Sequence, residues 1–299
     1  MLDNYAHNPY DVSAPALLRV PFVFNSPHSG RYYAPEFLAM SRLQNLDIRK
    51  SEDFLVDELF NGVVPLGAPM LKAIFPRAWL DVNREPYELD PKMFDEPLPN
   101  FVNTRSTRVA SGLGTIAQIV CEDMPIYSKK LGVEEGLNRI ETLYKPYHET
   151  LRHMLAKAMK RFGHSVLIDC HSMPSSQHRY GLKTRSHTVR ADFVLGDKYG
   201  ASCAPELTKA AQEFLTDLGY CVSINKPYAG GFITSHYGKP ESGLHALQVE
   251  INRALYMDEL NMKRSSNFEN LQRDLTTFSS RLMAIPEFVF KSGTRQAAE

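Results

Sequence analysis

A short run of apolar residues, SVLIDC at 165–170, constrains the fold more than any other part of the sequence. It lies between a long amphipathic pattern at 133–162 and the polar residues that begin at His171. Continuous apolar runs of this length are typical of strands that are buried on both faces of a sheet. Burial of both faces requires helices on both sides of the sheet, so the sequence predicts an α/β fold.

The rest of the chain repeats this alternation of short apolar runs and longer helical patterns. Strands are expected at 17–25, 70–75, 78–82, 192–195, 220–225 and 246–251, and further helices at 204–218 and 268–284. These elements predict a single-domain mixed β-sheet flanked by helices on both faces. The domain is expected to span residues 1–299, with a core at about 16–285 and a polar tail at 291–299.

Local signals predict where several elements begin and end. Ser51 is expected to cap a helix whose first turn holds Glu52 and Asp53. Pro146 is expected to kink the long helix at 133–162, and Gly163 to end it.

Two long connections are expected to be loops. Residues 86–111 are rich in Pro, Asp and Asn, which predicts a long loop or lid. Residues 226–238 contain paired glycines and then alternating apolar and polar residues, which predicts a flexible loop and a short hairpin that closes over a ligand.

Charge and composition exclude several classes of protein. The 34 Lys and Arg residues equal the 34 Asp and Glu residues in number, which argues against nucleic acid or an anionic membrane as a partner. No run of about 18 apolar residues occurs, and residues 1–18 show no basic segment followed by an apolar one, so we expect neither a membrane span nor a secretory leader. The 4 cysteines form no CxxC pair, which is typical of a reducing compartment, so we expect a soluble cytoplasmic protein.

Two apparent motifs are set aside. The histidines of HETLRH at 148–153 are five residues apart, about 140° around a helix, so we interpret the segment as a solvent-exposed helix face rather than a metal site. Cys170 ends the buried run and is interpreted as a small core residue rather than a nucleophile.

Polar residues at the expected strand ends form a candidate metal site. His28 and His171 each follow an apolar run, and ligands in α/β sheets bind beyond the carboxyl ends of strands. A carboxylate from Asp53 or Glu52 would complete a His₂-carboxylate zinc site. The alternative is that both histidines are hydrogen-bonded loop residues and both acids only favour a helix N-terminus.

Glu250 and Arg84 are the candidate catalytic residues. Glu250 lies in the apolar run 246–251, where burial would raise its pKa toward that of a general base. Arg84 follows a predicted strand, and a guanidinium there can hold a substrate carboxylate. The alternatives are a Glu250 that faces solvent or pairs with an arginine, and an Arg84 in a structural ion pair.

An ordered set of segments resembles the N-formylglutamate amidohydrolase (N-formylglutamate deformylase) family. They extend from about residue 18 to 260: PHSG, EDFLVDELF, WLDVNREP, IETLYKPYHETL, DCHSMPS, DFVLGDKYG, GGFITSHYG and GLHALQVEINRALYMDE. The resemblance implies a fold related to that of the zinc carboxypeptidases. Its order and spacing are more specific than any one segment.

The resemblance also implies roles for individual residues. His28, His171 and Asp53 would bind one Zn²⁺ per chain, and Glu250 would be the general acid and base. Asn83 and Arg84 would hold the carboxylate of the substrate, and Arg84 or His236 would stabilise the oxyanion. Gly231, Thr234 and His236 belong to the expected substrate-binding segment.

The predicted function is hydrolysis of the formyl C–N amide bond of N-formyl-L-glutamate, or of a related anionic N-acyl amino acid. The family resemblance places this activity in amino-acid degradation. Two alternatives remain: a non-catalytic protein that binds a metal or an amino acid, and a carboxypeptidase-like hydrolase of short peptides. The sequence predicts no oligomeric state.

Overall fold

The computed structural model describes residues 9–44, 46–175 and 191–290, and the predicted tail at 291–299 lies outside them. Its centre is a seven-stranded mixed sheet of order β1-β3-β2-β4-β7-β5-β6. The strands are β1 (Tyr10–Ser13), β2 (Phe22–Ser26), β3 (Met70–Ala73), β4 (Ser165–Met173), β5 (Phe193–Gly196), β6 (Val222–Ile224) and β7 (Leu244–Asn252). β8 (Met257–Asp258) and β9 (Lys263–Arg264) pair separately.

Strands β3, β2, β4 and β7 run parallel in the middle of the sheet. β1 is antiparallel to β3, and β5 is antiparallel to β7 but parallel to β6. The longest pairing joins β4 and β7 from Ser165↔Leu244 to Met173↔Asn252. The carboxyl ends of β2, β4 and β7 therefore lie side by side, as the sequence predicted for the site.

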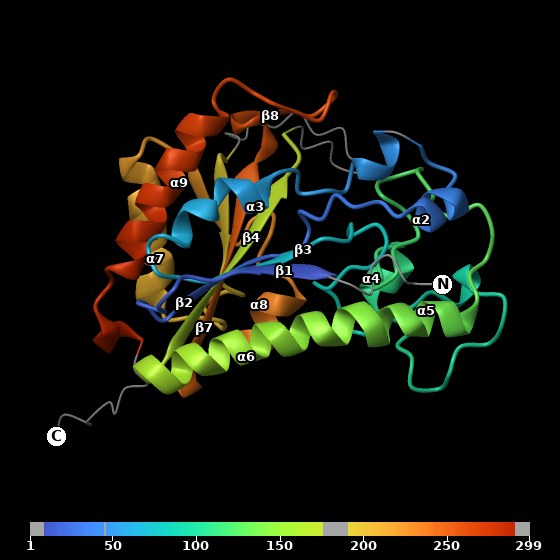
Figure 1. Ribbon diagram of the computed structural model, residues 1–299, viewed down its shortest axis with the longest axis horizontal. Helices are drawn as coiled ribbons and strands as arrows, with labels where there is room; N and C mark the ends of the chain where they lie inside the picture. Colours follow the sequence, from blue (N-terminus) through green and yellow to red (C-terminus); the bar gives the residue numbers. More distant parts are fainter. Residues whose placement is uncertain (1–8, 45, 176–190, 291–299) are drawn as a thin grey trace.

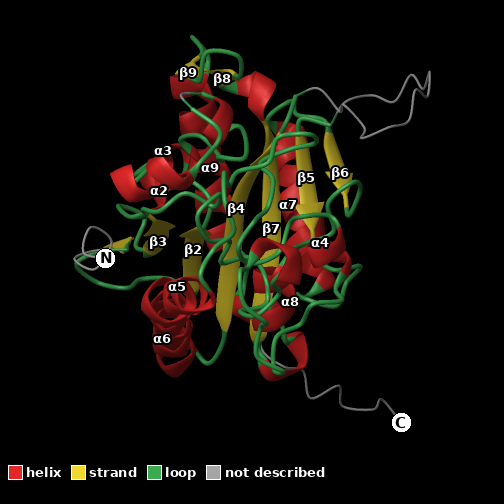
Figure 2. Ribbon diagram, turned by 90° about the vertical axis from the view of Figure 1, so that its right-hand side faces the viewer, coloured by secondary structure: helices red, strands yellow, loops and turns green. Residues whose placement is uncertain are grey.

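Helices cover both faces of the sheet, which confirms the predicted layers (Figures 1 and 2). Helix α6 lies along one face, and α3, α7 and α9 cover the other. The helices are α2 (Pro35–Met40), α3 (Val56–Leu59), α4 (Thr107–Ala110), α5 (Val133–Arg139), α6 (Lys145–Phe162), α7 (Pro205–Asp217), α8 (Phe232–Tyr237) and α9 (Phe268–Met283). None in the described ranges is long and apolar enough to cross a membrane.

Strand β4 shows how one face of the sheet becomes polar. Val166, Ile168 and Cys170 belong to the core under α7 and α9, which confirms Cys170 as a core residue. Leu167 belongs to the opposite core, under α6. Because side chains alternate along a strand, Asp169 and His171 continue the Leu167 face, so this face turns polar toward the carboxyl end.

The long helix is confirmed at 133–162, with one irregular turn. Residues Ile140–Tyr144 form a π-helical turn between α5 and α6. This turn ends two residues before Pro146. A proline has no N–H to donate, and its ring crowds the preceding turn. Gly163 ends α6 in a left-handed conformation, with φ 79°, and its N–H donates to the Met159 carbonyl.

Two of the predicted elements are wrong. Residues 78–82 form no strand, because the backbone N–H groups of Trp79 and Leu80 donate to the Pro76 carbonyl and that of Asp81 donates to the Thr115 carbonyl. Ser51 caps no helix, since α3 begins only at Val56.

Left-handed Leu55, with φ 58°, separates Glu52 and Asp53 from α3, so neither acid lies in a helical turn. The Asp53 N–H instead donates to the His28 carbonyl at 3.0 Å. This contact draws Asp53 toward the first candidate histidine.

The predicted hairpin within residues 226–238 is also wrong, because Phe232–Tyr237 form helix α8. Ile233, Thr234 and Tyr237 have the spacing of one helix face, and Ile233 and Thr234 are buried. A pattern of six residues fits both periodicities, and packing against β7 decides between them here. Residues 86–111 are mostly loop, as predicted, with only a 3₁₀ turn at Pro91–Met93 and the short helix α4.

Candidate metal centre and active site

His28 lies in the loop directly after β2 and is buried at 2% exposure. Its Nε2 lies 2.7 Å from Asp81 Oδ1, so the carboxylate accepts the ring hydrogen there. Its Nδ1 is buried and has no hydrogen-bond partner within the described ranges. This unpartnered nitrogen lies 3.5 Å from Asp53 Oδ2.

His171 approaches the same carboxylate from β4. Its Nδ1 lies 3.0 Å from Asp53 Oδ2, and the centroids of the two histidine rings are 4.8 Å apart. The three candidate ligand atoms of His28, Asp53 and His171 lie within 4.8 Å of one another. The structure therefore brings together the three residues that the sequence proposed as metal ligands.

The donor set fits a divalent metal ion. Nitrogen and carboxylate oxygen are the ligands of catalytic zinc, and the unpartnered Nδ1 of His28 points at the same oxygen as His171. Burial opposes ionisation of Asp53, but its contacts with His171 and His28 outweigh burial and lower its pKa well below the usual range. An ionised buried carboxylate beside two imidazoles is an arrangement that a cation would stabilise.

The structure also distinguishes between Asp53 and Glu52, the two candidates for the carboxylate ligand. Glu52 accepts hydrogen bonds from Arg49 Nε and Nη2, both at 2.9 Å, and from Tyr33 Oη at 3.2 Å. Its carboxylate is therefore occupied by another ion pair. The Oδ1 atom of Asp53 is held by Ser172 Oγ at 3.2 Å and Arg253 Nη2 at 3.3 Å, which leaves Oδ2 for the histidines.

A second carboxylate lies at the Nε2 atom of each histidine, the ring nitrogen that does not face Asp53. Asp81 faces His28 Nε2, and Asp169 Oδ2 lies 3.0 Å from His171 Nε2. Second carboxylates of this kind set which ring nitrogen of a metal-binding histidine keeps its hydrogen. Neither aspartate was assigned a role from the sequence, although Asp169 lies two residues before His171 and so on the same face of a strand.

Glu250 lies beside His171, because the two residues are paired across β4 and β7. It is buried at 7% exposure and accepts a hydrogen bond from Gln248 Nε2 at 2.8 Å. Burial raises the pKa of Glu250 to about 7. Within the described chain it pairs with no arginine within 4.0 Å, and the burial expected from the sequence is present.

Asn83 and Arg84 follow Asp81 after one intervening residue and lie in the same region. Asn83 Nδ2 lies 3.2 Å from His171 Nε2. Arg84 donates from Nε to the Leu113 carbonyl and from Nη1 to the Asn83 carbonyl, both at 2.8 Å. Its Nη2 lies 3.6 Å from Asp81, so donors at the end of the guanidinium remain for an anionic ligand.

The expected substrate-binding residues, Gly231 before α8 and Thr234 and His236 within it, lie in two different environments. The Gly231 N–H donates to Gln248 Oε1 at 2.7 Å, and a Cβ at Gly231 would lie 2.4 Å from Asn83 side-chain atoms. Thr234 is fully buried and its hydroxyl faces Gln248 at 3.4 Å. His236 is exposed and stacks on the Phe232 ring, so the structure does not bring it into the cluster.

His148 differs from its predicted place on a solvated face. It is buried at 8% exposure, with Nε2 2.8 Å from the Val82 carbonyl and Nδ1 2.9 Å from Tyr237 Oη. His153 is exposed, as predicted. His148 thus connects the segment that carries Asp81 and Asn83 to the end of α8.

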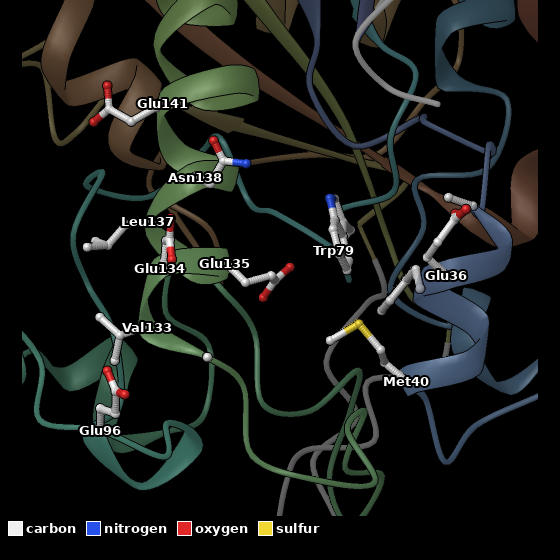
Figure 3. Close-up of a pocket in the computed structure, with 13 residues that line it drawn as sticks. Glu36, Met40, Trp79, Glu96, Val133, Glu134, Glu135, Leu137, Asn138 and Glu141 are labelled. Carbon is white, nitrogen blue, oxygen red and sulfur yellow. The ribbon is translucent and has the colours of Figure 1, made fainter. Parts of the chain in front are cut away.

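A separate cavity of about 970 Å³ lies between α2 and α5 and includes Trp79 in its lining (Figure 3). None of the candidate metal or catalytic residues lines it. Its lining includes the acidic side chains of Glu36, Glu96, Glu134, Glu135 and Glu141. These carboxylates repel an anionic ligand, so the cavity does not suit an anionic substrate. The positive charge of Arg84 suits such a substrate better.

Comparison with known proteins identifies the family. The N-formylglutamate amidohydrolase family matches residues 20–257. The chain belongs to the N-formylglutamate amidohydrolase family. It is 30% identical over 250 residues to an N-formylglutamate deformylase of Pseudomonas aeruginosa, with 81% of this chain and 84% of the relative covered. An N-formylglutamate deformylase of Pseudomonas putida is 28% identical, with 81% and 83% covered.

Solved structures agree with this family. The crystal structure of N-formylglutamate amidohydrolase from Ralstonia eutropha JMP134 matches with a TM-score of 0.86 and 36% identity, covering 92% of this chain and 97% of the other. A gene product of Agrobacterium tumefaciens shares the fold, with a TM-score of 0.63 and 16% identity over 94% and 95% of the two chains. The resemblance drawn from the sequence is confirmed, and the chain is a hydrolase of amide bonds.

Proposed function

We propose that this chain hydrolyses the formyl C–N amide bond of N-formyl-L-glutamate, giving formate and glutamate, with one zinc ion held by His28, Asp53 and His171. The observation that carries the proposal is the buried convergence of these three side chains beside Glu250. The deformylases to which the chain is similar support the substrate. Zinc bound there would supply a Lewis acid for the amide carbonyl and would acidify water in the site.

The residues of the chain itself divide the remaining work. With its pKa raised to about 7, Glu250 accepts the proton of the attacking water and returns it to the departing amine nitrogen. Arg84 and Asn83 hold a carboxylate of the substrate, and the free donors of Arg84 face the developing negative charge. Gln248 orients Glu250 through its amide and ties the carboxylate to the backbone of Gly231.

The proposal is tested by metal analysis of the purified protein together with an assay for released formate. We expect about one zinc per chain and turnover of N-formyl-L-glutamate. His171→Ala should lose both metal and turnover. Glu250→Gln should keep the metal and lose about 10²–10⁴-fold in kcat, the range for removal of a general base. His153→Ala is the matched control, because this exposed histidine on α6 should change neither quantity.

A substrate panel decides the remaining alternatives. N-formyl-L-glutamate should have a higher kcat/KM than N-formyl-L-aspartate, N-acetyl-L-glutamate and short peptides that end in glutamate. A higher kcat/KM for another compound of the panel would change the proposed substrate but not the proposed metal site. A metal-loaded protein with no turnover on the whole panel would indicate a binding protein instead, and full activity in His171→Ala would refute the metal site.

A further inference from the structure

Two hydrogen-bond arrangements compete at His171. Its Nδ1 lies 3.0 Å from Asp53 Oδ2, and its Nε2 lies 3.0 Å from Asp169 Oδ2 and 3.2 Å from Asn83 Nδ2. A neutral imidazole carries its hydrogen on only one nitrogen. A hydrogen on Nδ1 would donate to Asp53 and let Nε2 accept from Asn83. A hydrogen on Nε2 would donate to Asp169 and leave the Nδ1 lone pair facing Asp53 and His28.

A buried acceptor favours the second arrangement. Asp169 is fully buried, and its Oδ2 accepts no well-aligned hydrogen bond from the residues that the structure describes. An acceptor left in that state costs about 1–3 kcal/mol. The His171 Nε2–H group is the donor within reach, so a small ring rotation would satisfy Asp169 and free Nδ1 at the same time.

The position of Asp169 depends on Asn25 of β2. The two residues are paired across β2 and β4, and Asn25 Nδ2 donates to Asp169 Oδ1 at 2.8 Å. The Tyr147 hydroxyl, from α6, donates to Asn25 Oδ1. All three side chains are fully buried. Because a tyrosine hydroxyl donates to one end of the amide, the other end must point its N–H group at Asp169.

We propose that Asn25, oriented by Tyr147, is a positioning residue that holds Asp169 where it takes the Nε2 hydrogen of His171 and so frees Nδ1 for the metal. The inference rests on the proposed zinc site and deepens it. In the described structure, neither Asn25 nor Tyr147 makes a hydrogen bond to the proposed ligands, so their effect passes through Asp169. The expected signature is a change in metal affinity rather than in substrate binding.

Zinc affinity, measured by competition with a chromophoric chelator, tests the proposal in the full chain. Asn25→Leu removes both amide contacts and keeps the branching and the number of side-chain heavy atoms; it should raise the Kd for Zn²⁺ about 10–100-fold, the usual range for an outer-shell partner. Tyr147→Phe removes only one oxygen and should shift the Kd in the same direction by less. At saturating zinc, KM for N-formyl-L-glutamate should be unchanged in both variants.

Thr208→Val is the matched control. Thr208 also donates to a buried aspartate, Asp197, at 2.9 Å, but it lies on α7 at the other face of the sheet. The Thr208→Val variant should lose about as much unfolding free energy as Asn25→Leu, but it should keep the zinc affinity of the wild type. A second readout is the ¹⁵N shift of the His171 ring without metal, which should move toward the Nδ1–H form in Asn25→Leu.

The outcomes separate the inference from the proposed function. If the wild type binds zinc and both variants bind it equally well, with an unchanged His171 ring signal, Asn25 and Tyr147 only pack and the inference fails. If the wild type binds no zinc, the metal site itself fails and this inference fails with it. Should Asn25→Leu not fold, Tyr147→Phe carries the test alone.

Discussion

The two histidines of the candidate metal centre are supported in opposite ways. On the His28 side, Asp81 lies 2.7 Å from Arg77 Nη2 and 3.6 Å from Arg84 Nη2, and it also accepts the backbone N–H of Asn83 at 2.8 Å. Burial opposes ionisation of Asp81, but Arg84, His28 and Arg77 hold its pKa well below the usual range. We call this set, with His28, the charged arm.

On the His171 side, Asp169 has only a neutral support. Its contacts are Asn25 Nδ2 at 2.8 Å and His171 Nε2 at 3.0 Å, and no lysine or arginine in the described ranges lies within 4.0 Å of it. We call this set, with Tyr147, the neutral arm. The carboxylate of Asp81 has cationic partners without any ligand, whereas the carboxylate of Asp169 is left to be balanced by what the centre binds. The difference predicts that the charged arm contributes more to folding and the neutral arm more to metal binding.

The largest expected effect is on stability, in Asp81→Asn. This change removes the counter-charge of the partly exposed Arg77 and of the largely buried Arg84. Loss of one partner of a buried ion pair, as for Arg84, costs about 3–5 kcal/mol of unfolding free energy. Urea denaturation measures it. The control is Asp217→Asn, whose exposed pair with Arg281 should cost less than about 1 kcal/mol. Equal losses in the two variants would contradict the role of the charged arm.

A somewhat smaller effect is expected from acid, through His148. Burial lowers the pKa of His148 to about 4, whereas an unfolded histidine titrates near 6.5. Below about pH 6.5 the unfolded chain binds a proton that the folded chain does not, so stability falls as the pH is lowered. The loss reaches about 3 kcal/mol near pH 4, because each pKa unit corresponds to about 1.4 kcal/mol.

His148 follows Tyr147 of the neutral arm on α6, and it contacts the carbonyl of Val82, which follows Asp81 of the charged arm. Protonation of His148 therefore acts at the place where α6 contacts both arms. His148→Gln should flatten the decline in unfolding free energy between pH 6.5 and 4, as measured by urea denaturation at several pH values. His153→Ala, the exposed counterpart, should leave the decline as it is in the wild type. An undiminished decline in His148→Gln would show that other groups cause it.

A third prediction concerns Asp169→Asn in the neutral arm. The change keeps the shape of the side chain but removes the acceptor charge that faces His171, so zinc affinity should fall about 10–100-fold. No buried cation loses its partner, so the unfolding free energy should fall by less than in Asp81→Asn. Chelator competition and urea denaturation on the same samples measure both quantities. A stability loss as large as that of Asp81→Asn would abolish the distinction between the arms.

The sequence identified the histidine of each arm, and Asn83 and Arg84 of the charged arm, but it assigned no role to the two aspartates or to Arg77, Asn25 and Tyr147. His171 and Glu250 were found because each lies at the end of a buried apolar run, and Asp169 and Gln248 precede them by two residues on the same faces. A spacing of two residues along a strand predicts that these polar side chains lie on one face of the sheet. The sequence could not predict that β4 pairs with β7 in the register that places His171 beside Glu250, because register depends on non-local packing.

Asp53 and Asp81 lie on irregular backbone, where local patterns carry little information. Asp53 reaches the histidines because left-handed Leu55 delays α3, and a helical first turn was expected instead. Asp81 lies in a segment that was expected to be a strand. Tertiary hydrogen bonds from the backbone N–H groups of Asp53 and Asp81, to the His28 and Thr115 carbonyls, override the local preferences in both places.

The smallest expected effect compares one residue from each arm. Arg77→Gln removes one of the two guanidiniums near Asp81, but Arg84 and the Asn83 N–H remain and the hydrogen bond to His28 is kept. Since a partly exposed ion pair contributes about 1 kcal/mol or less, zinc affinity should fall by about fivefold at most. Asn25→Leu should weaken zinc binding more, although it removes no charge, because among the described residues Asn25 is the contact that holds Asp169 apart from His171 itself. Chelator competition on the two variants gives the order directly. A larger loss in Arg77→Gln would mean that charge near the centre, rather than the placement of Asp169, controls metal binding.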